Sequence, residues 1–154
     1  MTDRDTSSQP AEPATDHRGL RRLGFDECLS RLRDAKVGRI AFATGGEVVV
    51  LPVNPFVDDM TILFRTSWGS KLLAAERAEK VAFEVDDFDP AMATGWSVVV
   101  QGTLRVIDGD DECARLELVA PPPWLPQQDE SFWVAIQPYD VSGRELIPDD
   151  TTAG

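Results

Sequence analysis

Residues 39–53 read RIAFATGGEVVVLPV, and this stretch decides the fold. Apolar residues follow one another on both sides of Thr44-Gly45-Gly46-Glu47, a segment typical of a tight turn. The pattern predicts a β-hairpin with strands at Arg39–Ala43 and Val48–Val53. Pro52 has no backbone N–H to donate, so the second strand should end, bulge or lie at a sheet edge there.

The periodicity of strands continues along most of the remaining chain. Four more strands are predicted, at Met60–Thr66, Lys80–Asp86, Gly95–Asp108 and Phe132–Ile136. The first of these would lengthen the hairpin into a three-stranded meander, and Gly102 predicts a bend or bulge in the longest strand. Pro138 should interrupt strand pairing, after which residues 141–147 close the fold.

Three short helices are expected between the strands. Asp26 is the N-cap candidate of the first, which Gly38 would end, while Ser67 would cap a second over residues 68–76. Asp110 would cap a third over residues 111–119. Strands and helices do not alternate regularly and no repeat occurs, so we expect a small, mainly antiparallel barrel and not a doubly wound parallel sheet.

Composition separates one domain from two polar ends. Residues 1–19 are rich in Ser, Thr, Pro, Asp and Ala and are expected to form a disordered N-terminal tail. Residues 149–154 are expected to form a flexible C-terminal tail. The chain has 154 residues, the size of one ordinary domain, which we place at residues 20–148.

Charge and cysteine content exclude several classes of function. Acidic residues outnumber basic ones by 27 to 15, so a duplex nucleic acid would be repelled by the net charge of −12. The two cysteines and the single His17 are too few for a cysteine-built zinc site or a disulfide framework, and they disfavour a histidine-dependent triad. No apolar stretch is long enough for a membrane span or a secretory signal, so we expect a cytoplasmic protein.

The most informative local feature is Phe64-Arg65-Thr66-Ser67-Trp68-Gly69-Ser70-Lys71. Between Asp59 and Glu76 the chain has no acidic residue, although the protein is strongly acidic overall. Two cations, three hydroxyl groups, a glycine and a predicted helix start are the components of a phosphate site. The alternative is that Ser67 only caps the helix while Arg65 and Lys71 lie in solvent.

Residues 20–147 resemble the pyridoxamine 5'-phosphate oxidase-like family of flavin-binding split barrels, and in particular its small, single-domain actinobacterial-type members. The resemblance is carried, in this order, by Cys28-Leu29-Ser30-Arg31-Leu32, Gly38-Arg39-Ile40-Ala41-Phe42, Leu51-Pro52-Val53-Asn54, Ile62-Leu63-Phe64-Arg65-Thr66, Gly69-Ser70-Lys71-Leu72, Val81-Ala82-Phe83-Glu84-Val85-Asp86, Thr94-Gly95-Trp96-Ser97-Val98-Val99-Val100-Gln101-Gly102 and Val141-Ser142-Gly143-Arg144.

The resemblance implies a mainly β fold with short helices, a six-stranded antiparallel Greek-key split barrel that forms a homodimer. It also implies one flavin mononucleotide (FMN) in each of two clefts at the subunit interface. The residues expected to bind the phosphate are Arg65, Thr66, Ser70 and Lys71. Those expected against the flavin ring are Leu51, Pro52, Val53 and Asn54, with Trp96, Ser97 and Gln101 approaching from the same or the partner subunit.

One departure from the family narrows the expected function. True pyridoxamine 5'-phosphate oxidases carry arginine and histidine near the C-terminus to hold the substrate phosphate, whereas from Phe132 onward this chain has only Arg144 as a base and no histidine. We therefore expect an FMN-dependent oxidoreductase that takes reducing equivalents from a reduced nicotinamide and acts on a small, unidentified acceptor. Because flavin carries the redox chemistry itself, no catalytic side chain is assigned.

Alternatives remain at this point. A non-catalytic split barrel could bind flavin, deazaflavin or haem without turnover. The long anionic tail of deazaflavin calls for a broad basic groove, so a site with only Arg65 and Lys71 favours FMN. The acidic residues Glu84, Asp86, Asp87 and Asp89 lack the spacing of a calcium loop, and we interpret them as a solvated face with no metal.

Overall fold

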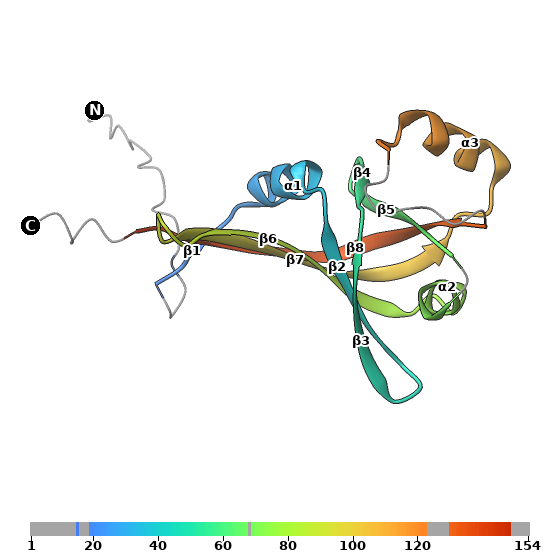
Figure 1. Ribbon diagram of the computed structural model, residues 1–154, viewed down its shortest axis with the longest axis horizontal. Helices are drawn as coiled ribbons and strands as arrows, with labels where there is room; N and C mark the ends of the chain where they lie inside the picture. The colour runs from blue at the N-terminus through green and yellow to red at the C-terminus, as the bar shows by residue number, and fades with distance from the viewer. Residues whose placement is uncertain (1–14, 16–18, 68, 123–129, 149–154) are drawn as a thin grey trace, which may run out of the picture.

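An antiparallel sheet forms the body of the protein in the computed structural model, which describes residues 15, 19–67, 69–122 and 130–148 (Figure 1). Eight strands are found among these residues. They are β1 (Arg21–Arg22), β2 (Gly38–Thr44), β3 (Glu47–Val53), β4 (Phe56–Asp58), β5 (Thr61–Thr66), β6 (Lys80–Asp89), β7 (Thr94–Val106) and β8 (Phe132–Leu146). The expected mainly β class is confirmed. The two strands beyond the six expected, β1 and β4, have two and three residues, too few to produce a periodic signal.

The order of strands differs from the predicted meander. The order is β3-β2-β6-β7-β8-β5-β4, with β1 also paired to β8. After the β2–β3 hairpin the chain crosses to the far end of the sheet, where β4 pairs with β5, and then returns to place β6 beside β2. Asp59, at a φ of 55°, turns the chain between β4 and β5. Of the three alternatives predicted at Pro52, an end, a bulge or an edge, the edge is the one found, because the described strand β3 is paired only with β2.

Strand β8 continues through Pro138, and the predicted interruption is wrong. Gln101 lies opposite Asp140 and Gly102 opposite Pro138, so Tyr139 is an extra residue in β8. This bulge accommodates the missing N–H of proline without ending the strand. The bulge predicted at Gly102 is confirmed, and a Cβ there would lie 2.6 Å from the Gln137 carbonyl oxygen.

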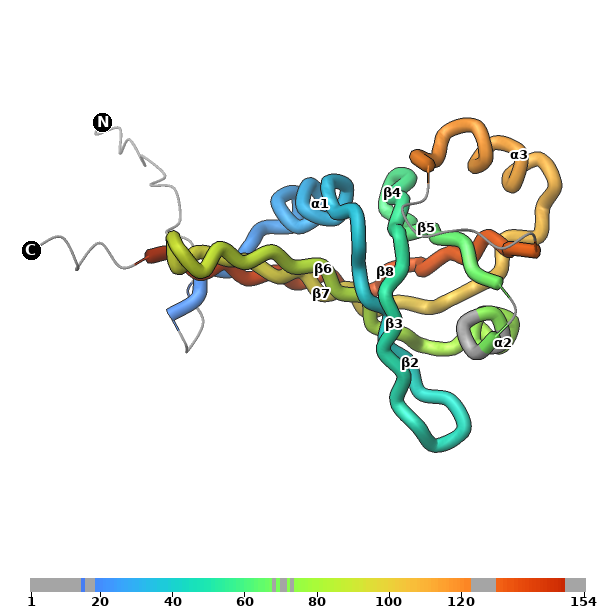
Figure 2. The backbone as a smooth tube through the Cα atoms, viewed as in Figure 1, coloured from blue at the N-terminus to red at the C-terminus, as the bar shows by residue number. Residues whose placement is uncertain are grey.

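Pairing also makes β6 longer than its sequence predicts. Its register with β7 continues to Asp89 opposite Thr94, beyond the predicted end at Asp86. Backbone pairing extends the hairpin over Asp87, Phe88 and Asp89, where a single apolar residue between two acids gives no strand signal. Together β6, β7 and β8 form a long arm that reaches past α1 (Figures 1 and 2).

The helices are α1 (Phe25–Asp34), α2 (Ser70–Glu76) and α3 (Asp110–Val119). Gly24, not Asp26, is the N-cap of α1, and its N–H donates to the Glu27 carboxylate at 2.9 Å. The helix ends at Asp34, before the predicted Gly38, which opens β2 instead. Helix α2 begins at Ser70, later than predicted. None of the helices described is long and apolar enough to cross a membrane.

Side-chain alternation builds a core on each face of the sheet. Helices α1 and α2 cover the larger one, in which Phe83 is fully buried. Its other members are Cys28, Leu32, Ile40, Phe42, Val53, Ile62, Phe64, Leu72, Ala74, Ala75, Val81, Val85, Val98, Val100, Leu104, Val134 and Ile136. The intervening residues of β5 and β8, which are Leu63, Trp133 and Ala135, form the second core with Ile107, which follows β7, and Leu116 of α3. The sheet therefore has an α1/α2 face and an α3 face.

A substitution at Gly38 would test how tightly the larger core is packed. A Cβ at this position would overlap the ring of Phe83, so Gly38→Val should cost about 1–3 kcal/mol of unfolding free energy through overpacking. Urea denaturation would measure the change. Gly109→Ala is the control, because its Cβ would lie 3.9 Å from its nearest neighbour. Equal stability of Gly38→Val and the unmodified protein would contradict this packing.

Candidate functional site

The acid-free segment between Asp59 and Glu76 contains the end of β5, where two predicted phosphate ligands are neighbours in sequence. Phe64 and Ile62 pack in the larger core, so Thr66 shares their face, whereas Arg65 shares the α3 face with Leu63. Arg65 and Thr66 thus point to opposite faces of the sheet at the same strand end. The sequence places them together, and the structure separates their side chains.

Arg65 is held by residues from α3 and from the start of β8. One of its Nη atoms donates to the Glu117 carboxylate at 2.9–3.0 Å, and the other donates to the Ser131 hydroxyl. The guanidinium carbon lies 5.5 Å from the centre of the Trp133 ring. Trp133 Nε1 donates to the same Glu117 carboxylate at 3.0 Å. The alternative of a solvated Arg65 side chain therefore does not describe this structure.

One donor of Arg65 is left unsatisfied. Its Nε is buried and has no hydrogen-bond partner, the only such side-chain atom found in the part of the chain that is described. Buried N–H groups in proteins are normally paired, because an unmade hydrogen bond is costly. Arg65 is thus a cation with a displaceable surface carboxylate on one side and an unused donor on another.

The rest of the predicted phosphate site follows Thr66. Thr66 is 6% exposed, and its hydroxyl donates to the Ser67 carbonyl oxygen at 3.3 Å. Ser70 and Lys71 open α2, whose first turn has no acidic residue. Their side chains, and Trp68 as a whole, lie outside the described residues.

The residues predicted to meet a flavin ring on β3 alternate in the same way. Val53 is buried in the larger core, against which Leu51 packs, and Pro52 is exposed on the other face. Asn54 Nδ2 donates to the Lys36 carbonyl oxygen at 2.9 Å, which ties the end of β3 to the segment after α1. Only Pro52 of this group therefore presents its side chain on the face that α1 and α2 leave uncovered.

The three ring neighbours predicted on β7, which are Trp96, Ser97 and Gln101, also lie on different faces of the sheet. Trp96 packs against the larger core, and the guanidinium carbon of Arg31 lies 4.9 Å from the centre of its ring. A helix side chain thus covers a face of the ring that a planar ligand would need. Ser97 is half-buried and Gln101 is exposed, and both belong to the uncovered face with Pro52.

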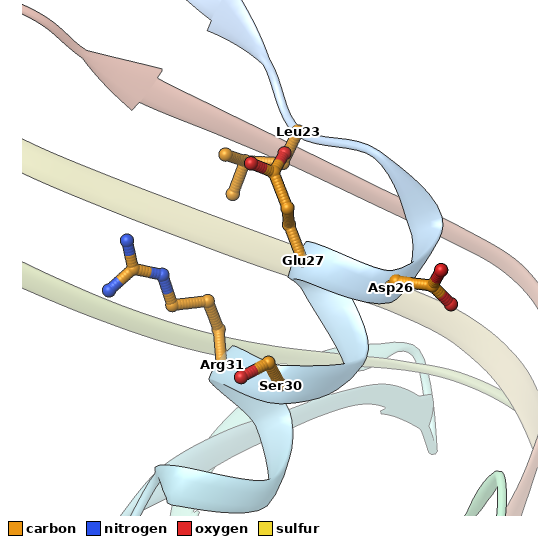
Figure 3. Close-up of a pocket in the computed structure, with 5 residues that line it drawn as sticks. All are labelled: Leu23, Asp26, Glu27, Ser30 and Arg31. Atoms are coloured by element: carbon orange, nitrogen blue, oxygen red, sulfur yellow. The ribbon is translucent and has the colours of Figure 1, made fainter.

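Arg31 belongs to an ion-pair network that joins α1 to the ends of β1 and β8. Arg21 pairs with Glu27 at 3.1 Å and with Glu145 at 2.5 Å, and Arg31 pairs with Glu145 at 3.4 Å. An open depression lies beside this network, lined by Leu23, Asp26, Glu27, Ser30 and Arg31 (Figure 3). Four of these five residues belong to α1. The ion pairs join this helix to β1 and β8 and so hold it against the arm.

The remaining titratable candidates carry no chemistry of their own. Burial raises the pKa of both thiols, Cys28 and Cys113, so both are protonated at neutral pH. Burial, together with the adjacent Asp86 carboxylate, raises the pKa of Glu84, and Arg39 pairs with both carboxylates. Among the described residues, no three histidine, cysteine or acidic side chains are grouped so as to hold a metal ion.

Sequence reasoning missed the three partners of Arg65. Glu117 and Ser131 lie 52 and 66 residues away along the chain, so no local pattern connects them to it. Trp133 is 7% exposed and belongs to the second core. Its alternation with Val134 was the available signal that it faces the α3 side.

The sheet order, its bulge and its two unequal cores define a small split barrel. Three comparisons agree with this class. The family model described as pyridoxamine 5'-phosphate oxidase matches residues 25–145, and the chain belongs to that family.

Similar proteins include three from Mycobacterium and Corynebacterium species. An uncharacterized protein of Mycobacterium tuberculosis is 33% identical over 84% of this chain and 88% of its own length. The FAD-binding protein of Mycobacterium smegmatis is 32% identical, with a TM-score of 0.67, over 81% of this chain and 97% of that one. A protein of unknown function from Corynebacterium diphtheriae is 32% identical, with a TM-score of 0.69, over 83% of this chain and 98% of that one.

The network around Glu27 predicts a pH effect on stability. The hydrogen bond from the Gly24 N–H, followed by that from Arg21, lowers the pKa of Glu27. A carboxyl group with a lowered pKa in the folded state stabilises the protein above its ordinary titration range and loses that effect as the pH falls through it. Glu27→Gln should therefore lower Tm at pH 7, and the difference should close in acid.

Thermal denaturation by circular dichroism between pH 3 and 7 would measure this difference. Asp26→Asn is the control, since it removes a neighbouring first-turn acid that does not make the bond to Gly24. A Glu27→Gln deficit that stays constant down to pH 3 would show that the carboxylate charge is not involved.

Proposed function

We propose that this protein binds a flavin nucleotide and works as a flavin-dependent oxidoreductase. Family membership and the similarity to the FAD-binding protein of M. smegmatis over nearly its full length support this proposal. The observation on the molecule itself that supports it is the end of β5, where a buried hydroxyl, a guanidinium with an unused donor and a carboxylate-free segment adjoin.

The residues at this position fit a phosphate group. Phosphate oxygens accept hydrogen bonds from hydroxyls and guanidinium groups and are repelled by carboxylates. The hydroxyls of Thr66 and Ser70 and the ammonium group of Lys71 would be the donors. The segment that contains them has no Asp or Glu that would repel the phosphate. Arg65 starts on the opposite face, so it would join them only after its guanidinium leaves Glu117 and reaches past the end of β5.

FMN is the nucleotide we propose, with Arg65, Thr66, Ser70 and Lys71 as its phosphate ligands. Leu51, Pro52, Val53 and Asn54, with Trp96, Ser97 and Gln101, remain the proposed neighbours of the ring. Trp96 contacts Arg31 of α1, and Asn54 donates to the Lys36 carbonyl oxygen. Trp96 and Asn54 would therefore act chiefly by holding α1 and β3 in place. FAD, named for the similar M. smegmatis protein, and deazaflavin are the competing cofactors.

A bound flavin would supply hydride or electron transfer between a reduced nicotinamide and a small acceptor. The chain's own part is to bind the phosphate, orient the ring beside β3 and exclude water. Pyridoxal phosphate synthesis is not proposed, because the segment from Phe132 onward has one base, Arg144, and no histidine to hold a substrate phosphate.

A homodimer is part of the proposal, because an exposed apolar row crosses the face of the sheet that α1 and α2 leave open, beside the ion pairs of Arg39. Val48 and Val50 are 78% and 57% exposed on the edge strand β3. Ala41 and Ala82 continue the row from Val50 on β2 and β6, and Val99 of β7 lies on the same face. Exposed apolar strips of this kind mark interfaces between proteins. A second copy seated here would meet Pro52, Ser97 and Gln101, the ring neighbours that share this face.

The phosphate assignment predicts the effect of removing one cation. Lys71→Ala should lose flavin, because no other lysine lies in the carboxylate-free segment. Purified protein would be mixed with FMN, FAD or deazaflavin in separate samples, freed of excess and examined by absorbance. Lys36→Ala, which removes the same charge from an exposed loop, is the matched control and should retain the flavin.

The three cofactors separate the alternatives. Retention of FMN above FAD supports the FMN assignment, and the reverse order replaces it with FAD. Retention of none overturns the proposed function. Retained flavin that is not reduced by a nicotinamide would identify a binding module instead of an oxidoreductase.

The dimer prediction concerns the row through Val50. Val50→Glu should turn a dimer into a monomer at micromolar concentration, because it would bury an unpaired charge in the interface. Sedimentation velocity would measure the assembly. Leu118→Glu is the control, since Leu118 is 86% exposed on α3, away from this row. An unmodified chain that is monomeric would contradict the prediction.

A further inference from the structure

The Arg65 cluster, made of Arg65, Glu117, Ser131 and Trp133, carries an inference that rests on the proposed function. Its four side chains come from β5, α3, the residue before β8 and β8 itself. Together they hold one guanidinium in a fixed orientation. The question is why a cation predicted to bind phosphate is paired with a carboxylate from a distant helix.

Glu117 gives Arg65 a carboxylate partner from outside the acid-free segment. The chain has no acid between Asp59 and Glu76, and Glu117 enters from α3 to contact an Nη atom of Arg65 at 2.9 Å. The Glu117 side chain is 49% exposed and that of Arg65 is 27% exposed. Ion pairs at such exposure are weakly held, so another anion can compete for the guanidinium.

The surroundings of Arg65 favour a phosphate over a carboxylate as that anion. Two of its donors are engaged by Glu117 and Ser131, and the buried Nε–H has no acceptor. A phosphate group offers more acceptor oxygens than a carboxylate and a larger charge, so it can satisfy a donor that Glu117 leaves open. Thr66, beside Arg65, lies opposite Phe132, so Ser131 also adjoins this strand end.

Helix α3 is attached in a way that allows Glu117 to withdraw. Leu116 is its one buried residue, and Arg115 forms a second ion pair, to Asp58 of β4, at 2.6 Å. Trp133 Nε1 donates to Glu117, so the carboxylate has an alternative partner when it releases Arg65. The helix therefore need not unfold for the exchange to occur.

We propose that Glu117 determines the affinity of this protein for its cofactor by competing with the cofactor phosphate for Arg65. Glu117 occupies the anion position of Arg65 when the phosphate is absent, and the phosphate displaces it on binding. Glu117 thus affects cofactor affinity through its contact with Arg65, the residue proposed to bind the phosphate. It does not contact the reacting ring.

The test compares FMN affinity among five proteins, the unmodified chain and four variants, by quenching of flavin fluorescence. Glu117→Gln removes the competing charge and keeps an amide oxygen for Trp133, so it should tighten binding by about two- to fivefold, the size expected for loss of an exposed ion pair. Asp58→Asn is the matched control, because it also removes one negative charge and one ion pair of α3 but leaves Arg65 paired. It should leave the affinity unchanged.

The single variant Arg65→Ala and the double variant Arg65→Ala, Glu117→Gln complete the set. The gain from Glu117→Gln should vanish when Arg65 is absent. Unchanged or weaker binding by Glu117→Gln, an equal gain in Asp58→Asn, or a gain that persists without Arg65 would each overturn the inference while leaving flavin binding intact. Thermal denaturation of each variant confirms that it is folded.

Failure of the proposed function is distinguished by a second probe. If the unmodified protein binds no flavin, inorganic phosphate is titrated into the ¹⁵N-labelled protein and the Arg65 Nε–H resonance is followed by NMR. A shift that saturates at lower phosphate concentration in Glu117→Gln than in Asp58→Asn supports the competition without any flavin. No difference between the two variants overturns it.

Discussion

Alternation of side chains across one antiparallel sheet is the constraint on which this structure depends. Because successive residues of a strand face opposite sides, β5 and β8 each contribute to two cores. Phe64 and Val134 join the core under α1 and α2, and Leu63 and Trp133 join the smaller core under α3. The same alternation places Arg65 and Thr66, and likewise Trp96 and Ser97, on opposite faces of the sheet, although each pair is adjacent in sequence.

The two faces have different roles. The α1/α2 face is closed by side chains of the chain itself, with Arg31 over Trp96 and the ion pairs of Arg21 and Glu145 fixing α1. Among the described residues, the other face is open along β3, β2, β6 and β7, and α3 covers one end of it. A second copy of the chain and a flavin would both use this open face, which links the proposed dimer to the proposed cofactor site.

Helix α3 connects the fold to the candidate chemistry. Its single buried leucine makes a small contribution to packing, while Arg115 and Glu117 place charges against β4 and β5. A helix held largely by exposed ion pairs responds to changes in local charge more readily than one held by a large core. That property makes Glu117 suited to compete with an incoming anion.

The sequence by itself determined the mainly β class, the β2–β3 hairpin, the edge position of Pro52 and the bulge at Gly102, because turn residues and strand periodicity act over a few neighbouring residues. It also showed the carboxylate-free segment around Arg65. Only the tertiary structure decided that β5 pairs with β8 and not with β3, and that Pro138 stays within a strand. It likewise decided that Glu117, 52 residues from Arg65, holds that guanidinium. These outcomes depend on register and on contacts between distant segments, for which a local pattern carries no signal.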